Sequence, residues 1–248
     1  MKRMLKQIAI ANTNARAAAI INYLHRFNLL YHIQYIDNKN FNIIVDINKK
    51  CKKLFESADD KTIFSAHYDV VSGSTGANDN ASSIVILLCL ARRIKNKPIQ
   101  IAFFCGEERG GIGSRAYIEE YITGYEKVKY SVVNLDVCGC GDQIVIVNNL
   151  YEDTKAYKLY NLKDKYSILE SPSFPFSDAE IFKRRDIATY SISVFPQGDI
   201  DILLGKTKGH FSSFVWEYMH NGQYDDIKYI NYKIMKKVYK YIKNILKA

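Results

Sequence analysis

An apolar segment flanked by two strand candidates constrains the fold more than any other feature of this chain. Residues 80–94 are apolar nearly all round, as in a helix that is buried on every side. Residues 62–67 form a strand-like run, and residues 99–104 form a continuous apolar run typical of a buried strand. Two strands joined through a buried helix predict a parallel crossover, and with it an α/β fold.

The other segments predict further helices and strands on both sides of this unit. An opening helix is expected over 13–28 with Thr13 as its cap, and residues 31–36 and 41–47 resemble the two strands of a hairpin. We therefore expect residues 1–248 to form a single domain, a three-layer αβα sandwich whose mixed, mostly parallel sheet carries helices on both faces. The remaining predicted elements are helices at 111–122, 152–164 and 177–185, strands at 130–136, 143–148 and 188–194, and long loops at 165–177 and 196–223.

The positive charge of the chain is concentrated at its C-terminal end. The formal net charge is +9, and residues 228–248 contain seven lysines and no acidic residue. Apolar residues recur there every three or four positions, from Ile227 to Ile245, as in an amphipathic helix. We interpret this segment as a final helix with a solvated lysine face. Binding of nucleic acid or of an anionic membrane is the alternative, and the prediction is that neither is a partner.

Cysteine content and hydropathy bear on the location of the protein. The five cysteines are few for the length and odd in number, which favours reduced thiols. No window approaches the ~18 consecutive apolar residues of a membrane span, and no secretory signal is recognised. We therefore expect a cytoplasmic protein. The sequence does not predict its oligomeric state.

Polar residues follow three of the predicted strands. His67 and Asp69 come at the end of one strand, Glu107 and Glu108 follow the next, and Asp136 follows a third. Ligands of open α/β sheets bind at this edge. Two adjacent glutamates repel each other unless a cation lies between them. The cation could be a metal ion or an arginine such as the next residue in the chain, Arg109.

A wider set of side chains favours the metal. Histidine and carboxylate groups together form a nitrogen and oxygen ligand set suited to two zinc-like ions, provided that one carboxylate bridges them. The candidate ligands are His67, Asp79, Glu108, Asp136 and His220.

Five motifs then resemble one known family, in the order in which that family has them. The resemblance is to the di-zinc exopeptidases that include aminopeptidase Y, bacterial leucyl aminopeptidases and glutaminyl cyclases, and it covers roughly residues 13–245. The first two motifs are the most specific. The motifs are HYDVVSGSTGANDNAS (67–82), CGEERGGIGS (105–114), NLDVCG (134–139), SDAEIF (177–182) and MHNGQYDDIKYIN (219–231).

The resemblance implies a role for each candidate. His67 would bind one zinc ion, Asp79 would bridge two, Glu108 and Asp136 would each complete one site, and His220 would close the set. Glu107 would be the general acid/base. A cis peptide bond is implied between Asp79 and Asn80.

Two aspartates are suited to support the histidine ligands. Asp69 and Asp225 lie close in sequence to His67 and His220, and each could accept the second N–H of its neighbouring imidazole. We therefore count Asp69 with the catalytic machinery.

The sequence departs from the family pattern at a few positions. Ser83 stands where glycine is common, and Ala179 follows Asp178 where histidine is common, which leaves the rim of the pocket undefined. His210 is a rival to His220, and the oxyanion donor is not recognisable, with Tyr218, Tyr224 and His210 as candidates.

The predicted function is that of a zinc-dependent aminopeptidase acting on peptides with a free N-terminus. Glutaminyl cyclase is the nearest alternative. In this family it resembles a site with one zinc ion and no ligand equivalent to His67, so the presence of His67 and Glu107 favours hydrolysis. A non-catalytic or nucleic-acid-binding module on the same fold would predict a damaged ligand set, which this sequence does not have.

Overall fold

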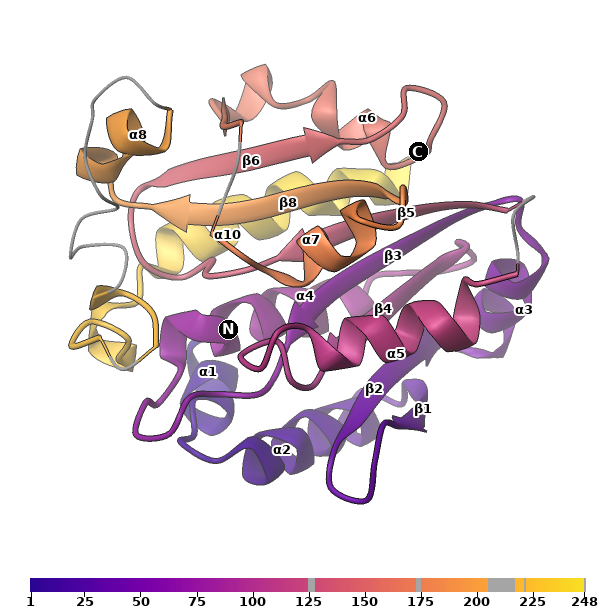
Figure 1. Ribbon diagram of the computed structural model, residues 1–248, viewed down its shortest axis with the longest axis horizontal. Coiled ribbons are helices and arrows are strands. Elements are labelled where there is room, and N and C mark those ends of the chain that lie inside the picture. Colours follow the sequence, from indigo (N-terminus) through magenta and orange to yellow (C-terminus); the bar gives the residue numbers. More distant parts are fainter. Residues whose placement is uncertain (125–127, 173–174, 205–216, 221, 248) are drawn as a thin grey trace.

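The computed structural model describes residues 1–124, 128–172, 175–204, 217–220 and 222–247. Within them, eight strands form one mixed sheet in the order β1-β2-β4-β3-β5-β8-β6-β7 (Figure 1). The predicted α/β class and the mixed central sheet are confirmed. The strands are β1 (Leu30–Tyr35), β2 (Phe41–Ile47), β3 (Asp60–His67), β4 (Ile99–Phe104), β5 (Lys129–Leu135), β6 (Gln143–Asn149), β7 (Leu169–Glu170) and β8 (Ala188–Phe195).

The centre of the sheet is parallel and its flanks are antiparallel. Strands β4, β3, β5 and β8 run in one direction, with β3 paired to both β4 and β5. β2 pairs antiparallel with β4, and β6 with β8. β1 and β2 form the predicted hairpin, and the crossover from β3 to β4 is parallel as predicted. The carboxyl ends of the central strands consequently share one edge of the sheet.

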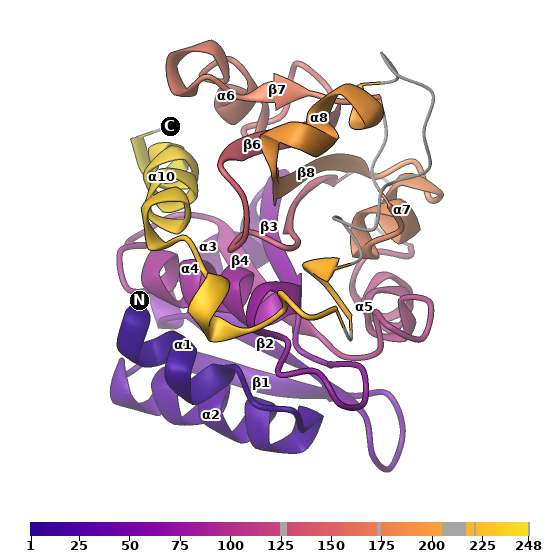
Figure 2. The ribbon, with the colours of Figure 1, turned by 90° about the vertical axis from the view of Figure 1, so that its left-hand side faces the viewer.

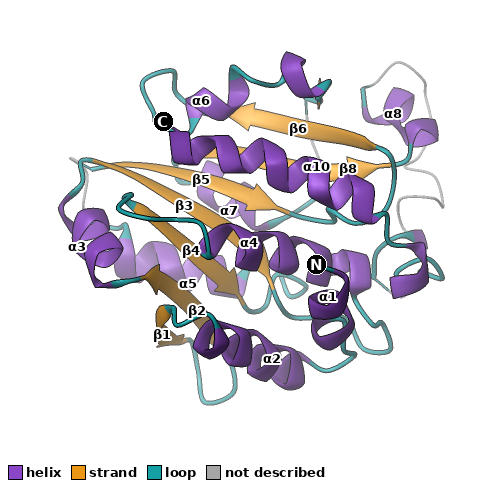
Figure 3. Cartoon of the chain, turned by 180° about the vertical axis from the view of Figure 1, so that it is seen from behind, coloured by secondary structure: helices purple, strands orange, loops and turns teal. Residues whose placement is uncertain are grey.

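Helices cover both faces of the sheet, as expected for three layers. One face carries α1 (Lys2–Ile8), α2 (Thr13–Arg26), α4 (Ser83–Ala91) and α10 (Tyr232–Ile242), and the other carries α5 (Ile112–Tyr121) and α7 (Asp178–Lys183) (Figures 2 and 3). The remaining helices, α3 (Lys49–Ser57), α6 (Tyr157–Tyr160) and α8 (Gln197–Leu203), lie around the margins of the sheet (Figure 1).

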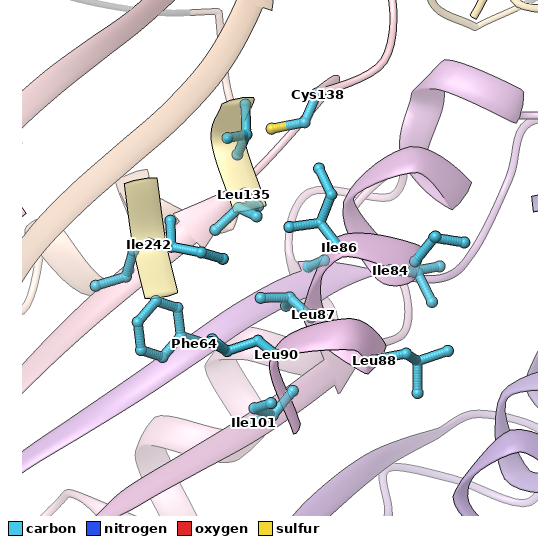
Figure 4. Close-up of a cluster of buried hydrophobic side chains, with 14 of the residues drawn as sticks. Phe64, Ile84, Ile86, Leu87, Leu88, Leu90, Ile101, Leu135, Cys138 and Ile242 are labelled. Carbon is cyan, nitrogen blue, oxygen red and sulfur yellow. The ribbon is translucent and has the colours of Figure 1, made fainter. Parts of the chain in front are cut away.

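Helix α4 is the centre of the larger hydrophobic core. Its Ile86, Leu87 and Leu90 are fully buried, and Figure 4 shows these side chains between β3, β4 and α10, near Phe64 and Ile242. Burial of one such side chain contributes about 1.5–3 kcal/mol to folding. The sequence that precedes α4 is therefore held on a rigid support.

The C-terminal helix has the amphipathic character that the sequence predicts. In α10, Ile234, Met235 and Val238 are buried in the core, while Lys236 and Lys240 are exposed. The lysine excess is therefore the solvated face of a packed helix.

Several local predictions were wrong. Helices α1 and α3 were not predicted. In α3, Cys51, Leu54 and Phe55 lie on one face and Asn48 caps the helix, so the sequence held a short amphipathic pattern that was overlooked. The cap of α2 is Asn12, whose side chain accepts the N–H of Ala15 at 2.9 Å, and not Thr13. The expected loop at 196–223 contains α8, and the expected loop at 165–177 contains β7.

Two further observations concern cysteines and membranes. All five cysteines are free thiols.

None of the helices in the described ranges combines the length and the apolarity that crossing a bilayer requires.

Candidate metal centre

Three parallel strands deliver the polar side chains to one edge of the sheet. His67 ends β3, Asp136 comes directly after β5, and Glu107 and Glu108 lie in the turn after β4, where they follow Cys105 and Gly106. The side chains predicted at these strand ends therefore meet.

The five candidate ligands form two overlapping groups around Asp79. His67, Asp79 and Asp136 form one group, and Asp79, Glu108 and His220 form the other, with the ligand atoms of each group within 4.8 Å of one another. Nε2 of His67 lies 3.0 Å from Oδ1 of Asp79 and 3.5 Å from Oδ1 of Asp136. Nε2 of His220 lies 3.4 Å from Oε2 of Glu108 and 3.9 Å from Oδ2 of Asp79. Asp79 thus faces one histidine with each of its oxygens.

The loop that carries Asp79 is fixed on both sides of this residue. The peptide bond between Asp79 and Asn80 is cis, as predicted. The side chain of Asn80 donates to the carbonyl of Leu135 at 3.0 Å, and Oδ1 of Asn78 accepts the N–H of Gly139 at 2.8 Å. The two asparagines therefore tether the loop to the end of β5 and to the segment that follows it, on either side of Asp136.

Asp69 supports more of the site than the sequence predicted. Its Oδ1 lies 3.4 Å from Nδ1 of His67, which is the expected neighbour, but the two atoms are not aligned for a hydrogen bond. Its two oxygens also accept the backbone N–H groups of Glu107 at 3.2 Å and Glu108 at 3.1 Å. One buried carboxylate therefore contacts a histidine and fixes the turn that bears both glutamates.

The carboxylate of Asp225 contacts the Asp79 loop. Oδ1 accepts the N–H groups of Asn78 at 2.7 Å and Asp79 at 3.2 Å, and Oδ2 accepts the hydroxyl of Ser74 at 2.5 Å. The sequence suggested an imidazole as its partner, so these contacts were not foreseen. They connect the C-terminal part of the chain to the loop of the central candidate ligand.

The charges in this cluster fit divalent cations. Burial raises the pKa of Glu108 to about 8, and the negative charge of Asp79 adds to the shift. Burial also raises the pKa of Asp136. Oε1 of Glu108 and Oδ1 of Asp136 are buried and make no hydrogen bond within the described part of the chain. Buried carboxylates are normally paired or bound to metal, so these residues fit a metal site.

Glu107 differs from its neighbour in position. It is 7% exposed and lines a pocket together with Asp79, Asp136 and His220. Burial raises its pKa to about 10. A carboxylate that borders such a pocket can exchange protons with a molecule bound there.

The other sequence candidates have varied outcomes. Arg109 does not lie between the two glutamates as their counter-charge. It is exposed, and its Nη2 donates to Oδ1 of Asn40 at 2.7 Å. Tyr218 and Tyr224 stack on each other with ring centroids 5.0 Å apart. His210 lies outside the described residues.

One residue near the site was missed altogether. Arg16 on α2 is 0% exposed, and its guanidinium group reaches the loop between β3 and Asp79. A signal was present, because Arg16 lies four residues before Ile20 and so on the apolar stripe of its helix. A charge on such a stripe indicates a specific buried partner.

The fold and the histidine-carboxylate cluster together define an α/β protein with side chains that could hold a metal ion at the carboxyl edge of its sheet. The model of peptidase family M28 matches residues 42–246. The chain therefore belongs to peptidase family M28. Aminopeptidase YwaD of Bacillus subtilis is 36% identical over 93 residues, which are 36% of this chain and 20% of that protein.

Solved structures share the fold. A zinc aminopeptidase from Bacillus subtilis matches 83% of this chain and 49% of its own with a TM-score of 0.63 at 20% identity. LapA aminopeptidase from Legionella pneumophila matches 98% of this chain and 69% of its own with a TM-score of 0.70 at 15% identity. Glutaminyl cyclase from Porphyromonas gingivalis matches 99% of this chain and 94% of its own with a TM-score of 0.68 at 16% identity. This chain thus spans about half the length of the Bacillus aminopeptidase structure.

Proposed function

We propose that the protein is a zinc-dependent aminopeptidase that removes the N-terminal residue from peptides. The observation that carries this proposal is the pair of ligand groups that share Asp79. One zinc ion would be held by His67, Asp79 and Asp136, and a second by Asp79, Glu108 and His220. Membership of peptidase family M28 supports hydrolysis of a peptide bond.

The chemistry divides between the metal ions and the side chains. When bound, the ions would polarise the scissile carbonyl group and lower the pKa of a water molecule. The positive charge of the ions would also lower the pKa of the buried Glu107, so that its ionised carboxylate would accept a proton from the attacking water and pass it to the nitrogen of the leaving amine. Asp69 would keep Glu107 in place through its backbone N–H, and it contacts the ring of His67.

One observation favours glutaminyl cyclase as a second candidate. The glutaminyl cyclase of Porphyromonas gingivalis shares its fold with 99% of this chain, with a TM-score of 0.68. In a cyclase, the α-amino group of an N-terminal glutamine attacks the carbon of its side-chain amide, ammonia leaves, and no water is consumed. The two candidates therefore predict different products from different substrates.

The partners and location follow from the same proposal. Peptides with a free N-terminus would be the substrates, and nucleic acid would not be a partner. We also propose a cytoplasmic location, which the free thiols of all five cysteines support.

Metal analysis paired with a substrate screen tests the proposal. Purified protein would be analysed for zinc and then assayed with a panel of aminoacyl chromogenic amides and with peptides that begin with glutamine. Two zinc ions per chain with release of the chromophore are expected. Ring closure of the glutaminyl peptides without any amide hydrolysis would establish the cyclase in its place.

A further inference from the structure

The buried arginine Arg16 joins the two ends of the loop between two candidate metal ligands. Its Nη1 donates to the carbonyl of Asp69 at 3.3 Å, and its Nη2 donates to the carbonyls of Thr75 at 2.9 Å and Gly76 at 3.2 Å. A further bond reaches the carbonyl of Ile10 at 3.4 Å. One planar guanidinium group therefore binds the backbone at the start and at the end of this loop.

The two ends of the loop adjoin His67 and Asp79. Asp69 comes two residues after His67, and Gly76 comes three residues before Asp79. We propose that Arg16 is a positioning residue that holds His67 and Asp79 at the separation that metal binding requires, before any metal arrives. The inference rests on the proposed zinc site and adds a residue outside all five motifs.

The fit between Arg16 and the loop is close. A Cβ atom on Gly76 would lie 2.2 Å from Nη2 of Arg16 and 2.5 Å from the carbonyl oxygen of Asp79. Gly76 also has a φ of +53°, which favours glycine. Only a residue without a side chain lets the loop approach the guanidinium this closely.

The charge of Arg16 suits the same role. Burial lowers its pKa to about 10, and the charges of Asp79, Asp225, Asp69 and Glu108 act in the opposite direction. The group therefore remains a cation at neutral pH. Its positive charge interacts with these carboxylates and offsets part of their mutual repulsion in the metal-free protein.

The effect of Arg16 extends to the glutamates through Asp69. The guanidinium binds the backbone carbonyl of Asp69, while the side chain of Asp69 accepts the N–H groups of Glu107 and Glu108. Displacement of the loop would therefore disturb the ligand groups on both sides of Asp79.

Zinc affinity of Arg16→Met tests the proposal. Methionine keeps an unbranched side chain but lacks the charge and all the N–H donors. The dissociation constants would be measured by competition with a chromogenic chelator, well below the melting temperature of each metal-free variant. The control is Arg26→Met, which removes an exposed arginine from the same helix. We expect Arg16→Met to weaken zinc binding by about 10- to 100-fold, the range typical of groups that orient metal ligands, and Arg26→Met to leave it unchanged.

A second variant keeps the test decisive if Arg16→Met does not fold. Arg16→Lys retains the charge and loses the planar fork, so a weakening of at least several-fold is expected from it as well. A folded Arg16→Met or Arg16→Lys with wild-type zinc affinity would overturn the proposal, because a purely structural role lowers the melting temperature without altering the affinity. Failure of the wild type itself to bind zinc would instead overturn the proposed function.

Discussion

Asp79 offers its two carboxylate oxygens to different histidines: Oδ1 lies 3.0 Å from Nε2 of His67, and Oδ2 lies 3.9 Å from Nε2 of His220. No other candidate ligand belongs to both groups of the site. This geometry is what a carboxylate needs in order to bridge two metal ions.

The bridging role predicts different zinc contents for two variants. Asp79→Asn removes a negative ligand from both groups, so zinc binding should be weakened at both sites. His220→Ala removes a ligand from one group only and should leave one zinc ion bound. Elemental analysis after gel filtration measures the ratio of zinc to protein. Two tightly bound zinc ions in Asp79→Asn would refute the bridge.

The carboxylate of Asp46 on β2 should make the free energy of unfolding depend on pH in the acid range. Burial alone would raise the pKa of Asp46, but the hydrogen bonds from His32 at 2.9 Å and from Gln100 at 3.1 Å, together with the charge of Lys52, hold it below its usual value. A lowered pKa in the folded state contributes stability above pH ~4, and this contribution is lost as the pH falls through the folded-state value.

Asp46→Asn tests this contribution. The variant should lower the free energy of unfolding by about 1–3 kcal/mol at pH 7, because buried hydrogen bonds to a charge are lost. The difference from the wild type should shrink as the pH falls below 4. Urea denaturation at several pH values measures it, and a difference that grows toward acid pH would contradict the assigned cause.

The lysine face of α10 is expected to have no ligand. Replacing four lysines by glutamine (Lys236, Lys237, Lys240 and Lys243) should leave amide hydrolysis within a few-fold of the wild type, because exposed substitutions far from a site change little. Binding to DNA or RNA would be followed at increasing salt. Tight binding by the wild type with a steep salt dependence, abolished in the variant, would show that the charge serves a nucleic acid.

Much of the fold could be predicted because the relevant signals are local. The apolar runs that became β2 and β4 have the predicted boundaries, and the ionisable residues after β3, β4 and β5 had to meet once those strands were parallel. His67, Glu108 and Asp136 lie together for this reason, whereas Asp79 comes from the segment before α4 and His220 from the segment before α10. Their roles remain proposals that the metal analysis tests.

The contacts that hold the loop of Asp79 in place could not be predicted, since they join distant parts of the chain. Asp225 and Ser74 are 151 residues apart, and no local pattern connects them. The contact of Arg16 with Thr75 depends equally on how α2 packs beside the loop. Helix α3 was missed for a different reason, because its amphipathic pattern is short and most of its residues are exposed and polar.

The turnover of Glu107→Gln, measured with the zinc content of the same sample, tests the central claim most directly. Glutamine keeps the size of Glu107 but cannot accept the proton. Glu107 belongs to neither of the two ligand groups that share Asp79, but it lies close to His67 and Glu108 in a third group, so the zinc content of the variant also tests whether it is a ligand. The account predicts two bound zinc ions, little change in KM and a kcat lowered by about 10² to 10⁴, whereas Glu108→Ala should lose zinc. Near-normal turnover of an aminoacyl amide by Glu107→Gln, with both zinc ions bound, would contradict it.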